Sequence, residues 1–166
     1  MDAMDENIYD LIKDNQSRDV EEQQVVEEQN FLLFSINSKK YALSSNFVRE
    51  LLKDIEVFPL PFVPSYIDGV LNRYGDSYAV IEPAYLFNEK KQESSLFIVF
   101  NDENKICIKI SDVYDFYTIP VSEIQTFTED DSSKYFEGIF KYQDDDVLII
   151  RKDSVVEKIE KDFERL

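Results

Sequence analysis

The sequence contains no histidine and no tryptophan, one cysteine and only three glycines among its 166 residues. Without histidine the chain has no His-ligated metal site, no Ser-His-Asp or Cys-His catalytic arrangement and no phosphohistidine. Because Cys107 is the single cysteine, no disulfide forms within the chain. The run "KICIKIS" around this thiol predicts a packing residue of a strand, and the sequence supplies no partner base for a nucleophilic role.

Other motifs that carry chemistry are missing as well. We find no EF-hand spacing, no glycine-rich phosphate loop and no G-x-G-x-x-G. The stretch "IDGV" at 67–70 lacks the hydroxyl residue of the aspartic-protease motif D-T-G. The run "QDDDV" at 143–147 could bind a cation, but three acids between two apolar runs are more typical of a solvated turn. We therefore expect no catalytic residue, no cofactor and no metal, and an enzyme built on carboxylates is the least favoured alternative.

The charge balance excludes several partners. Thirty-five acidic residues against 18 basic ones leave a net charge of −17. Nucleic acid is a poor partner, because binding a phosphate backbone requires a basic face, and anionic membranes are disfavoured for the same reason. No apolar run approaches the roughly 20 residues needed to span a bilayer, so direct membrane insertion is not expected. The acidic start "MDAMDENIYD" is unlike a signal peptide, and we expect a cytoplasmic protein.

Residues 1–30 differ from the rest of the chain. They include ten acidic and two basic residues and no glycine, proline or phenylalanine. Such a segment buries too little apolar surface to offset its ordering entropy, so we expect an acidic, mobile N-terminal extension. An alternative is a short helix formed around Ile8, Leu11 and Ile12, whose helical spacing would let it dock on this domain or on a partner.

From residue 31 onward, short β-type runs alternate with polar turns, which predicts a mainly β fold. About five strands fall in each half of 31–166, and the halves meet near 84–94. In the run 105–111, Ile106, Ile108 and Ile110 share one face, so we expect that face alone to be core. Ser154 and Glu157 form a capping box, which predicts an amphipathic C-terminal helix over 154–165. Since closure removes exposed edges, two small barrels suit this pattern.

Several of these stretches together resemble one family. "FLLFSINSKKYALSSNFVRELL", "PLPFVPSYIDGVLNRYG" and "AVIEP" are similar to the CheW family of bacterial chemotaxis coupling proteins, in which an F-x-x-F strand precedes V-x-E-[IL], a proline loop and G-V-x-N-L-R-G. In the second half, "ISDVYDF" and "YFEGIFKYQDDDVLIIRKDSVV" look like the V-D-x-V-x-[ED]-V segment and the closing hairpin and helix of that family. The resemblance covers about residues 31–163.

The resemblance implies a fold and a function. The fold would be two five-stranded SH3-like β-barrel subdomains in one CheW-like domain over 31–166, with a C-terminal amphipathic helix. The function would be a non-catalytic adaptor that joins the cytoplasmic tips of chemoreceptors to the regulatory domain of the histidine kinase CheA, in the cytoplasm at the receptor array. Another CheW-like protein of the array is a further expected partner.

The resemblance also implies sites. The receptor-facing residues would be Val48, Glu50, Leu51, Asn72, Arg73, Tyr74 and Gly75. The kinase would meet strands of the first barrel, including Tyr41 and Leu43, although core packing explains these two residues equally well. We expect Gly75 to take a positive φ, Asn72 to hydrogen-bond that turn and Gly69 to allow close packing.

The departures from the family pattern bear on function. Tyr74 stands where the family has arginine, and Asp76 and Ser77 follow Gly75 where apolar residues are usual. Because a planar cation and an aromatic ring recognise different partners, we expect a divergent paralogue with altered partner preference. Arg73 is not expected to replace the arginine, since adjacent extended residues point to opposite faces. The alternative is an interaction module of another signalling assembly that has kept the fold and lost receptor binding.

Overall fold

The computed structural model describes residues 25–128 and 134–164. Most of the predicted N-terminal extension lies outside the described residues, but β1 begins at Glu28, three residues before the predicted boundary. The strands are β1 (Glu28–Ile36), β2 (Lys39–Ser44), β3 (Val48–Lys53), β4 (Ile67–Arg73), β5 (Asp76–Ile81), β6 (Leu96–Phe100), β7 (Ile106–Ile110), β8 (Asp112–Pro120), β9 (Gln125–Thr126), β10 (Phe136–Tyr142) and β11 (Asp145–Ile150). The helices are η1 (Ser45–Phe47), α2 (Pro83–Leu86), η2 (Val121–Glu123) and α3 (Lys152–Glu164).

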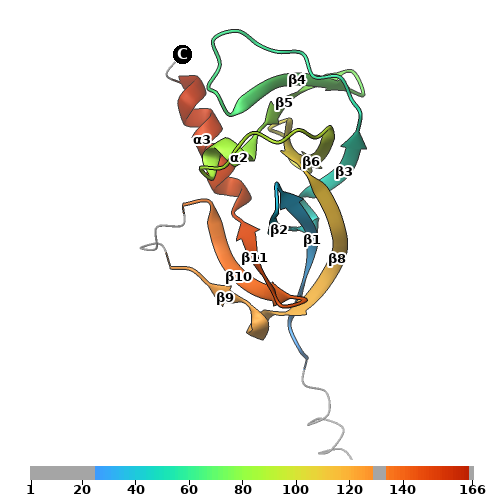
Figure 1. Cartoon of the computed structure of the whole chain (residues 1–166), viewed down its shortest axis with the longest axis vertical. Coiled ribbons are helices and arrows are strands. Elements are labelled where there is room, and N and C mark those ends of the chain that lie inside the picture. The colour runs from blue at the N-terminus through green and yellow to red at the C-terminus, as the bar shows by residue number, and fades with distance from the viewer. Residues whose placement is uncertain (1–24, 129–133, 165–166) are drawn as a thin grey trace, which may run out of the picture.

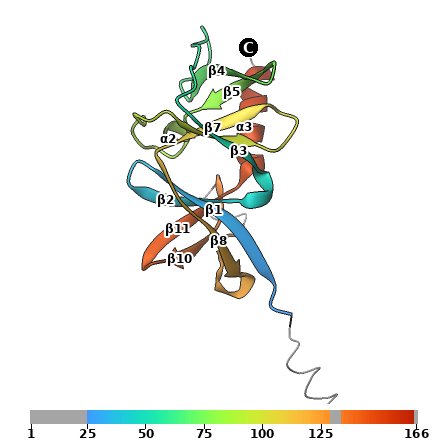
Figure 2. The same ribbon diagram turned by 90° about the vertical axis from the view of Figure 1, so that its right-hand side faces the viewer.

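The described strands form two sheets, as Figures 1 and 2 show. The six-stranded sheet has the order β8-β1-β2-β11-β10-β9, and the five-stranded sheet has the order β3-β6-β7-β5-β4. Within each sheet two antiparallel hairpins meet through one parallel pair, β2 with β11 and β7 with β5. The mainly β fold with a C-terminal helix is the one the sequence predicts.

The sheets do not follow the division of the chain near 84–94. The β1–β2 hairpin pairs with β11 of the second half, whereas the β6–β7 hairpin of the second half pairs with β5 of the first. Each half therefore contributes one hairpin to the other's sheet. Alternation of apolar residues indicates which face of a strand is buried but not which strand lies beside it, so the sequence pattern could not place these hairpins.

The two halves nevertheless repeat each other. "YIDGVLNRYGDSYAVI" at 66–81 and "YFEGIFKYQDDDVLII" at 135–150 form the hairpins β4–β5 and β10–β11 in the same register. Both hairpins shift register at their glycine, and both turn through two residues of positive φ, Tyr74 and Gly75 in one, Gln143 and Asp144 in the other. The edge strands β3 and β8 also match, each with one bulged residue near its start. The molecule thus has internal pseudo-symmetry.

Central strands are buried on both faces. In β7, Ile106, Ile108 and Ile110 join the core shared by the two sheets and α3, while Cys107 lies in a smaller core within the five-stranded sheet. The prediction of a single core face for this strand is therefore wrong, because the sheet curves around a second core on its other side. Burial raises the pKa of the Cys107 thiol to about 12, which fits a packing role.

The C-terminal helix begins earlier than predicted. It starts at Lys152, so Ser154 lies inside the first turn and does not act as its cap. The apolar face is as expected, since Val155, Val156 and Ile159 are buried in the shared core. Tyr66 also anchors the helix, because its hydroxyl donates to Asp162 at 2.6 Å.

Gly69 occupies a position that no other residue fits. Its φ is +146°, and a Cβ at this site would lie 2.1 Å from the carbonyl oxygen of Phe58, which pairs with Val70 on β4. The proline-containing loop therefore approaches the strand backbone directly over this residue, as its expected packing role requires.

We expect Gly69→Ala to lower the free energy of unfolding by about 2 kcal/mol or more, because the clash with backbone cannot be relieved by a rotamer change. Gly75→Ala is the control, since Gly75 has φ +80° but open space around its Cβ position, and we expect a loss near 1 kcal/mol. Urea denaturation followed by circular dichroism measures both, and equal losses would contradict the packing role of Gly69.

Candidate functional site

The receptor-facing residues predicted from the sequence come together where side chains from the two edge strands of the five-stranded sheet meet. Val48, Glu50 and Leu51 lie on the edge strand β3, and the turn between β4 and β5 lies on the opposite edge of the same sheet. We call these predicted residues together with Arg49 the first edge surface: Val48, Arg49, Glu50, Leu51, Asn72, Arg73, Tyr74 and Gly75. No backbone pairing joins β3 to β4 in the described chain, so side chains make the connection.

An ion pair links the two edges. The Arg73 guanidinium donates to both carboxylate oxygens of Glu50 at 3.3 and 3.4 Å. The same guanidinium lies over the Tyr74 ring, 4.4 Å from its centroid, and donates to the Tyr74 hydroxyl at 3.1 Å. Hydrogen bonding to Glu50 raises the pKa of Arg73, which therefore stays charged. These contacts fix the turn relative to β3.

The expectation that Arg73 and Tyr74 point apart is wrong. Alternation holds for extended residues, but Tyr74 has φ +52° and is the first residue of a two-residue hairpin turn. In that left-handed conformation its ring folds back under the Arg73 guanidinium. The tyrosine in the family's arginine position thus forms a platform for the neighbouring arginine.

Sequence reasoning missed Arg49, the bulged residue of β3. Its guanidinium lies 5.8 Å from the Tyr74 ring centroid and donates to the Tyr78 hydroxyl at 2.9 Å. Arg49, Glu50 and Tyr74 line a shallow pocket of about 270 Å³. Strand alternation does not predict this position, because only the bulge directs the Arg49 side chain toward the β4–β5 turn.

The other turn residues behave partly as expected. Gly75 has φ +80°, which confirms the expected positive value. Asn72 does not bond the turn backbone, because its side-chain oxygen accepts from the hydroxyl of Ser77, its cross-strand neighbour, at 2.9 Å. Leu51 and Tyr74 are 36% and 68% exposed, so an apolar and an aromatic side chain remain available on this surface.

The two residues predicted to contact a kinase lie elsewhere. Tyr41 and Leu43 are 1% and 0% exposed and belong to the core shared by both sheets. Tyr41 stacks near Phe87 and Phe136, and its hydroxyl donates to Glu89 at 3.0 Å. The structure therefore gives these side chains a packing role, because β2 is a central strand and its two faces are covered.

A buried ion cluster joins several strands of the five-stranded sheet. The Lys109 ammonium on β7 is 3.4 Å from Asp68 and 3.7 Å from Glu82, and Lys91 approaches Asp68 at 3.6 Å. Gln92 donates to Glu82 at 2.8 Å and to the Lys109 carbonyl at 2.9 Å. Burial raises the pKa of Glu82, although Gln92 and Lys109 oppose this. The cluster ties β4, β7, the residue between β5 and α2, and the segment after α2 together.

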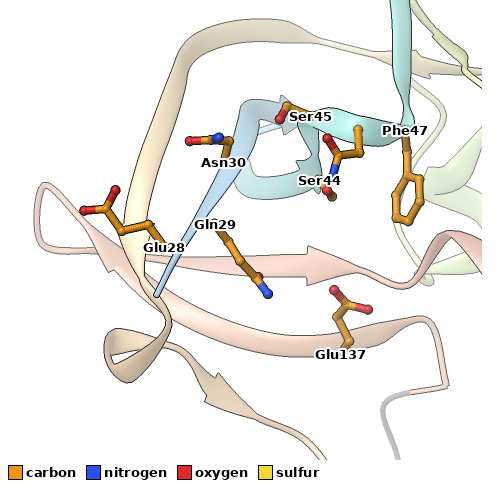
Figure 3. A pocket seen from close by; sticks show the side chains of 8 residues that line it. Glu28, Gln29, Asn30, Ser44, Ser45, Phe47 and Glu137 are labelled. Atoms are coloured by element: carbon orange, nitrogen blue, oxygen red, sulfur yellow. The ribbon is translucent and has the colours of Figure 1, made fainter. Parts of the chain in front are cut away.

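The six-stranded sheet has a polar pocket at the corresponding place. Ser44 corresponds to Lys109 and Glu137 to Asp68, so the ammonium has no counterpart there. The result is a pocket of about 310 Å³ lined by Glu28, Gln29, Asn30, Ser44, Ser45, Asn46, Phe47 and Glu137. Figure 3 shows Gln29 and Glu137 reaching into it from β1 and β10. Burial raises the pKa of Glu137, with the charge of Arg151 opposing.

The described residues contain no group of three or more Cys, Asp or Glu side chains arranged to hold a metal. Over 25–128 and 134–164, every helix is too short or too polar to cross a bilayer. The first edge surface presents charged, apolar and aromatic side chains that are at least partly exposed.

Comparisons with known proteins agree with this architecture. A family model described as a CheW-like domain matches residues 30–160. The crystal structure of the scaffolding protein TtCheW from Thermoanaerobacter tengcongensis is similar, with 24% sequence identity and a TM-score of 0.69 over 75% of this chain and 90% of that chain. No curated protein sequence matches the chain. The structural likeness shows the fold, and the family match covers most of the chain.

We expect Lys109→Met to lower the free energy of unfolding by about 3 kcal/mol at neutral pH, because two buried carboxylates lose their cation. Burial already raises the folded-state pKa of Glu82 above its ordinary value of 4.5, and the substitution raises it further. The loss should therefore shrink as pH falls through that raised pKa, since protonated Glu82 needs no cation. Urea unfolding at about pH 7.5 and about pH 5 measures the difference.

Lys105→Met is the matched control for this cluster. Lys105 pairs with Asp76 at 3.0 Å, and their side chains are 52% and 48% exposed. We expect a loss below about 1 kcal/mol that changes little over the same pH range, because water screens this pair. A similar loss for both lysine variants would contradict a stabilising role of the buried cluster.

Proposed function

The chain belongs to the family of CheW-like domains, and from this premise we propose that it is a non-catalytic adaptor of chemotaxis signalling. It couples the cytoplasmic tips of chemoreceptors to the regulatory domain of the histidine kinase CheA. It acts in the cytoplasm, at the receptor array, which it reaches through these partners. CheW-like proteins are scaffolds, and a scaffold needs rigid surfaces and no reacting groups.

The clustering at the first edge surface carries the proposal. The residues at the family's V-x-E-[IL] and N-L-R-G positions come from strands at opposite edges of the sheet, and the Glu50–Arg73 pair joins them. Leu51, the residue after Glu50 on this edge strand, adds an exposed apolar side chain. An adaptor surface of this kind binds through an apolar contact flanked by oriented charges.

The rigidity of the surface suits a coupling role. Arg73 is held by Glu50 and Tyr74, and Arg49 is held by Tyr78, whose ring belongs to the small core of the five-stranded sheet. Binding to groups that are already fixed costs less conformational entropy. Receptor contacts at this edge are thus positioned by the sheet itself.

We expect Leu51→Lys to weaken binding of a receptor tip fragment about tenfold, since a charge replaces the apolar contact at the centre of the surface. Calorimetric titration of the full chain with the tip fragment, and separately with the CheA regulatory domain, measures this. Tyr85→Lys is the control, because Tyr85 is 42% exposed on α2, away from the first edge surface. A folded wild-type chain that binds neither partner would overturn the adaptor function.

The alternative function is an interaction module of another signalling assembly without receptor binding. The observation that favours it is Tyr74, which stands in the family's arginine position. Its ring and its hydroxyl are both in contact with the Arg73 guanidinium. In this case the fold would be kept while the receptor contact is lost.

A graft separates the two functions. Arg73→Leu combined with Tyr74→Arg restores the family order and places a guanidinium at the turn position, next to Glu50. If the chain is a divergent receptor adaptor, we expect the graft to tighten binding of a typical receptor tip about tenfold, because a planar cation recognises carboxylates in a bidentate manner. Unchanged binding from a folded variant would favour the alternative module.

A further inference from the structure

The six-stranded sheet carries a counterpart of the first edge surface. By the internal repeat, Val113–Phe116 on β8 correspond to Val48–Leu51 on β3, and the β10–β11 turn corresponds to the β4–β5 turn. Tyr114 is the bulged residue of β8, as Arg49 is of β3. We call Lys40, Val113, Tyr114, Asp115, Phe116, Tyr142 and Asp144 the second edge surface.

The contacts within the two surfaces also correspond. The Tyr142 hydroxyl lies 3.5 Å from Asp115, where the equivalent Arg73 and Glu50 form their ion pair at 3.3 Å. Lys40 pairs with Asp145 at 2.7 Å, as the equivalent Lys105 pairs with Asp76 at 3.0 Å. The two surfaces therefore share one arrangement of strands and turn but carry different side chains.

The second edge surface is open and aromatic. Tyr114 and Phe116 are 45% and 62% exposed on β8, the outer strand of its sheet. The Lys40 ammonium lies 5.0 Å from the Tyr114 ring centroid and 5.6 Å from that of Tyr142. Lys40 also borders a neighbouring pocket of about 400 Å³ that Ile139 and Leu148 line.

The charges of the two surfaces are opposite. The first edge surface and its neighbours carry a net charge of +1, from the basic residues Arg49, Arg73 and Lys105 and the acidic residues Glu50 and Asp76. Around the second, the equivalent positions and their turn carry four aspartates and two lysines, which gives −2. The lysines are Lys40 and Lys141, and the aspartates are Asp115, Asp144, Asp145 and Asp146.

We propose that the second edge surface is a docking site for a partner segment that presents lysine or arginine side chains. The face of an aromatic ring attracts a cation, and a carboxylate beside the ring forms an ion pair with the same cation. Acidic residues on an edge strand also discourage aggregation, but that role does not require the exposed aromatic side chains that the same strand carries. The inference rests on the proposed function, because it takes the first edge surface as a docking site and extends it to its repeat.

Charge reversal tests the site. We expect Asp115→Lys to weaken binding of either the CheA regulatory domain or the receptor tip fragment by about tenfold or more, and Phe116→Ser to weaken the same complex. Glu157→Lys is the control of equal charge change, since Glu157 is exposed on the solvent face of α3. Circular dichroism melting shows that each variant is folded.

The outcomes separate the site from the proposed function. If the wild-type chain binds both partners and Asp115→Lys leaves both affinities within twofold, the second edge surface is not a docking site, while the adaptor function stands. If the wild-type chain binds neither partner, the adaptor function fails. The docking site is then tested separately, by titrating the chain with a peptide of alternating lysine and valine and recording the shifts of its backbone NMR signals. Shifts confined to β8 and the β10–β11 turn that disappear in Asp115→Lys support it. Shifts spread over the acidic surface and equally reduced in Glu157→Lys overturn it.

Discussion

The exchange of hairpins between the two halves is the constraint on which the rest of the structure depends. The β1–β2 hairpin completes the sheet of β10 and β11, and the β6–β7 hairpin completes the sheet of β4 and β5. Neither half of the chain can therefore cover its own central strands. The shared core between the sheets and the two smaller cores within them form only when both halves are in place.

This exchange determines which residues are free to act. Strands at the centre of each sheet are buried on both faces along their middle residues, so Tyr41 and Leu43 of β2 serve packing. The outer strands β3 and β8 keep one open edge, and each meets a two-residue hairpin turn at that edge. Docking chemistry is thus concentrated where the sheet ends.

Because the fold repeats internally, equivalent positions on its two surfaces hold side chains of different chemistry. Corresponding positions hold Arg73 and Glu50 on one surface, and Tyr142 and Asp115 on the other. The buried cation Lys109 of one half has Ser44 as its counterpart, and a polar pocket beside Glu137 results. The backbone frame tolerates these changes because hydrogen bonding between strands does not depend on side chains.

Much of this protein follows from its sequence. The alternating runs predict a mainly β chain, the scarce glycines at 69 and 75 mark a close approach and a turn, and the motif order indicates the family. These features are local, because they depend on residues near one another in the chain. Only the tertiary structure decided the exchange of hairpins, the second core beneath Cys107, and the convergence of Arg49, Arg73 and Tyr74. Each depends on residues far apart in sequence or on a bulge or turn that reverses a side chain, and alternation carries no information about either.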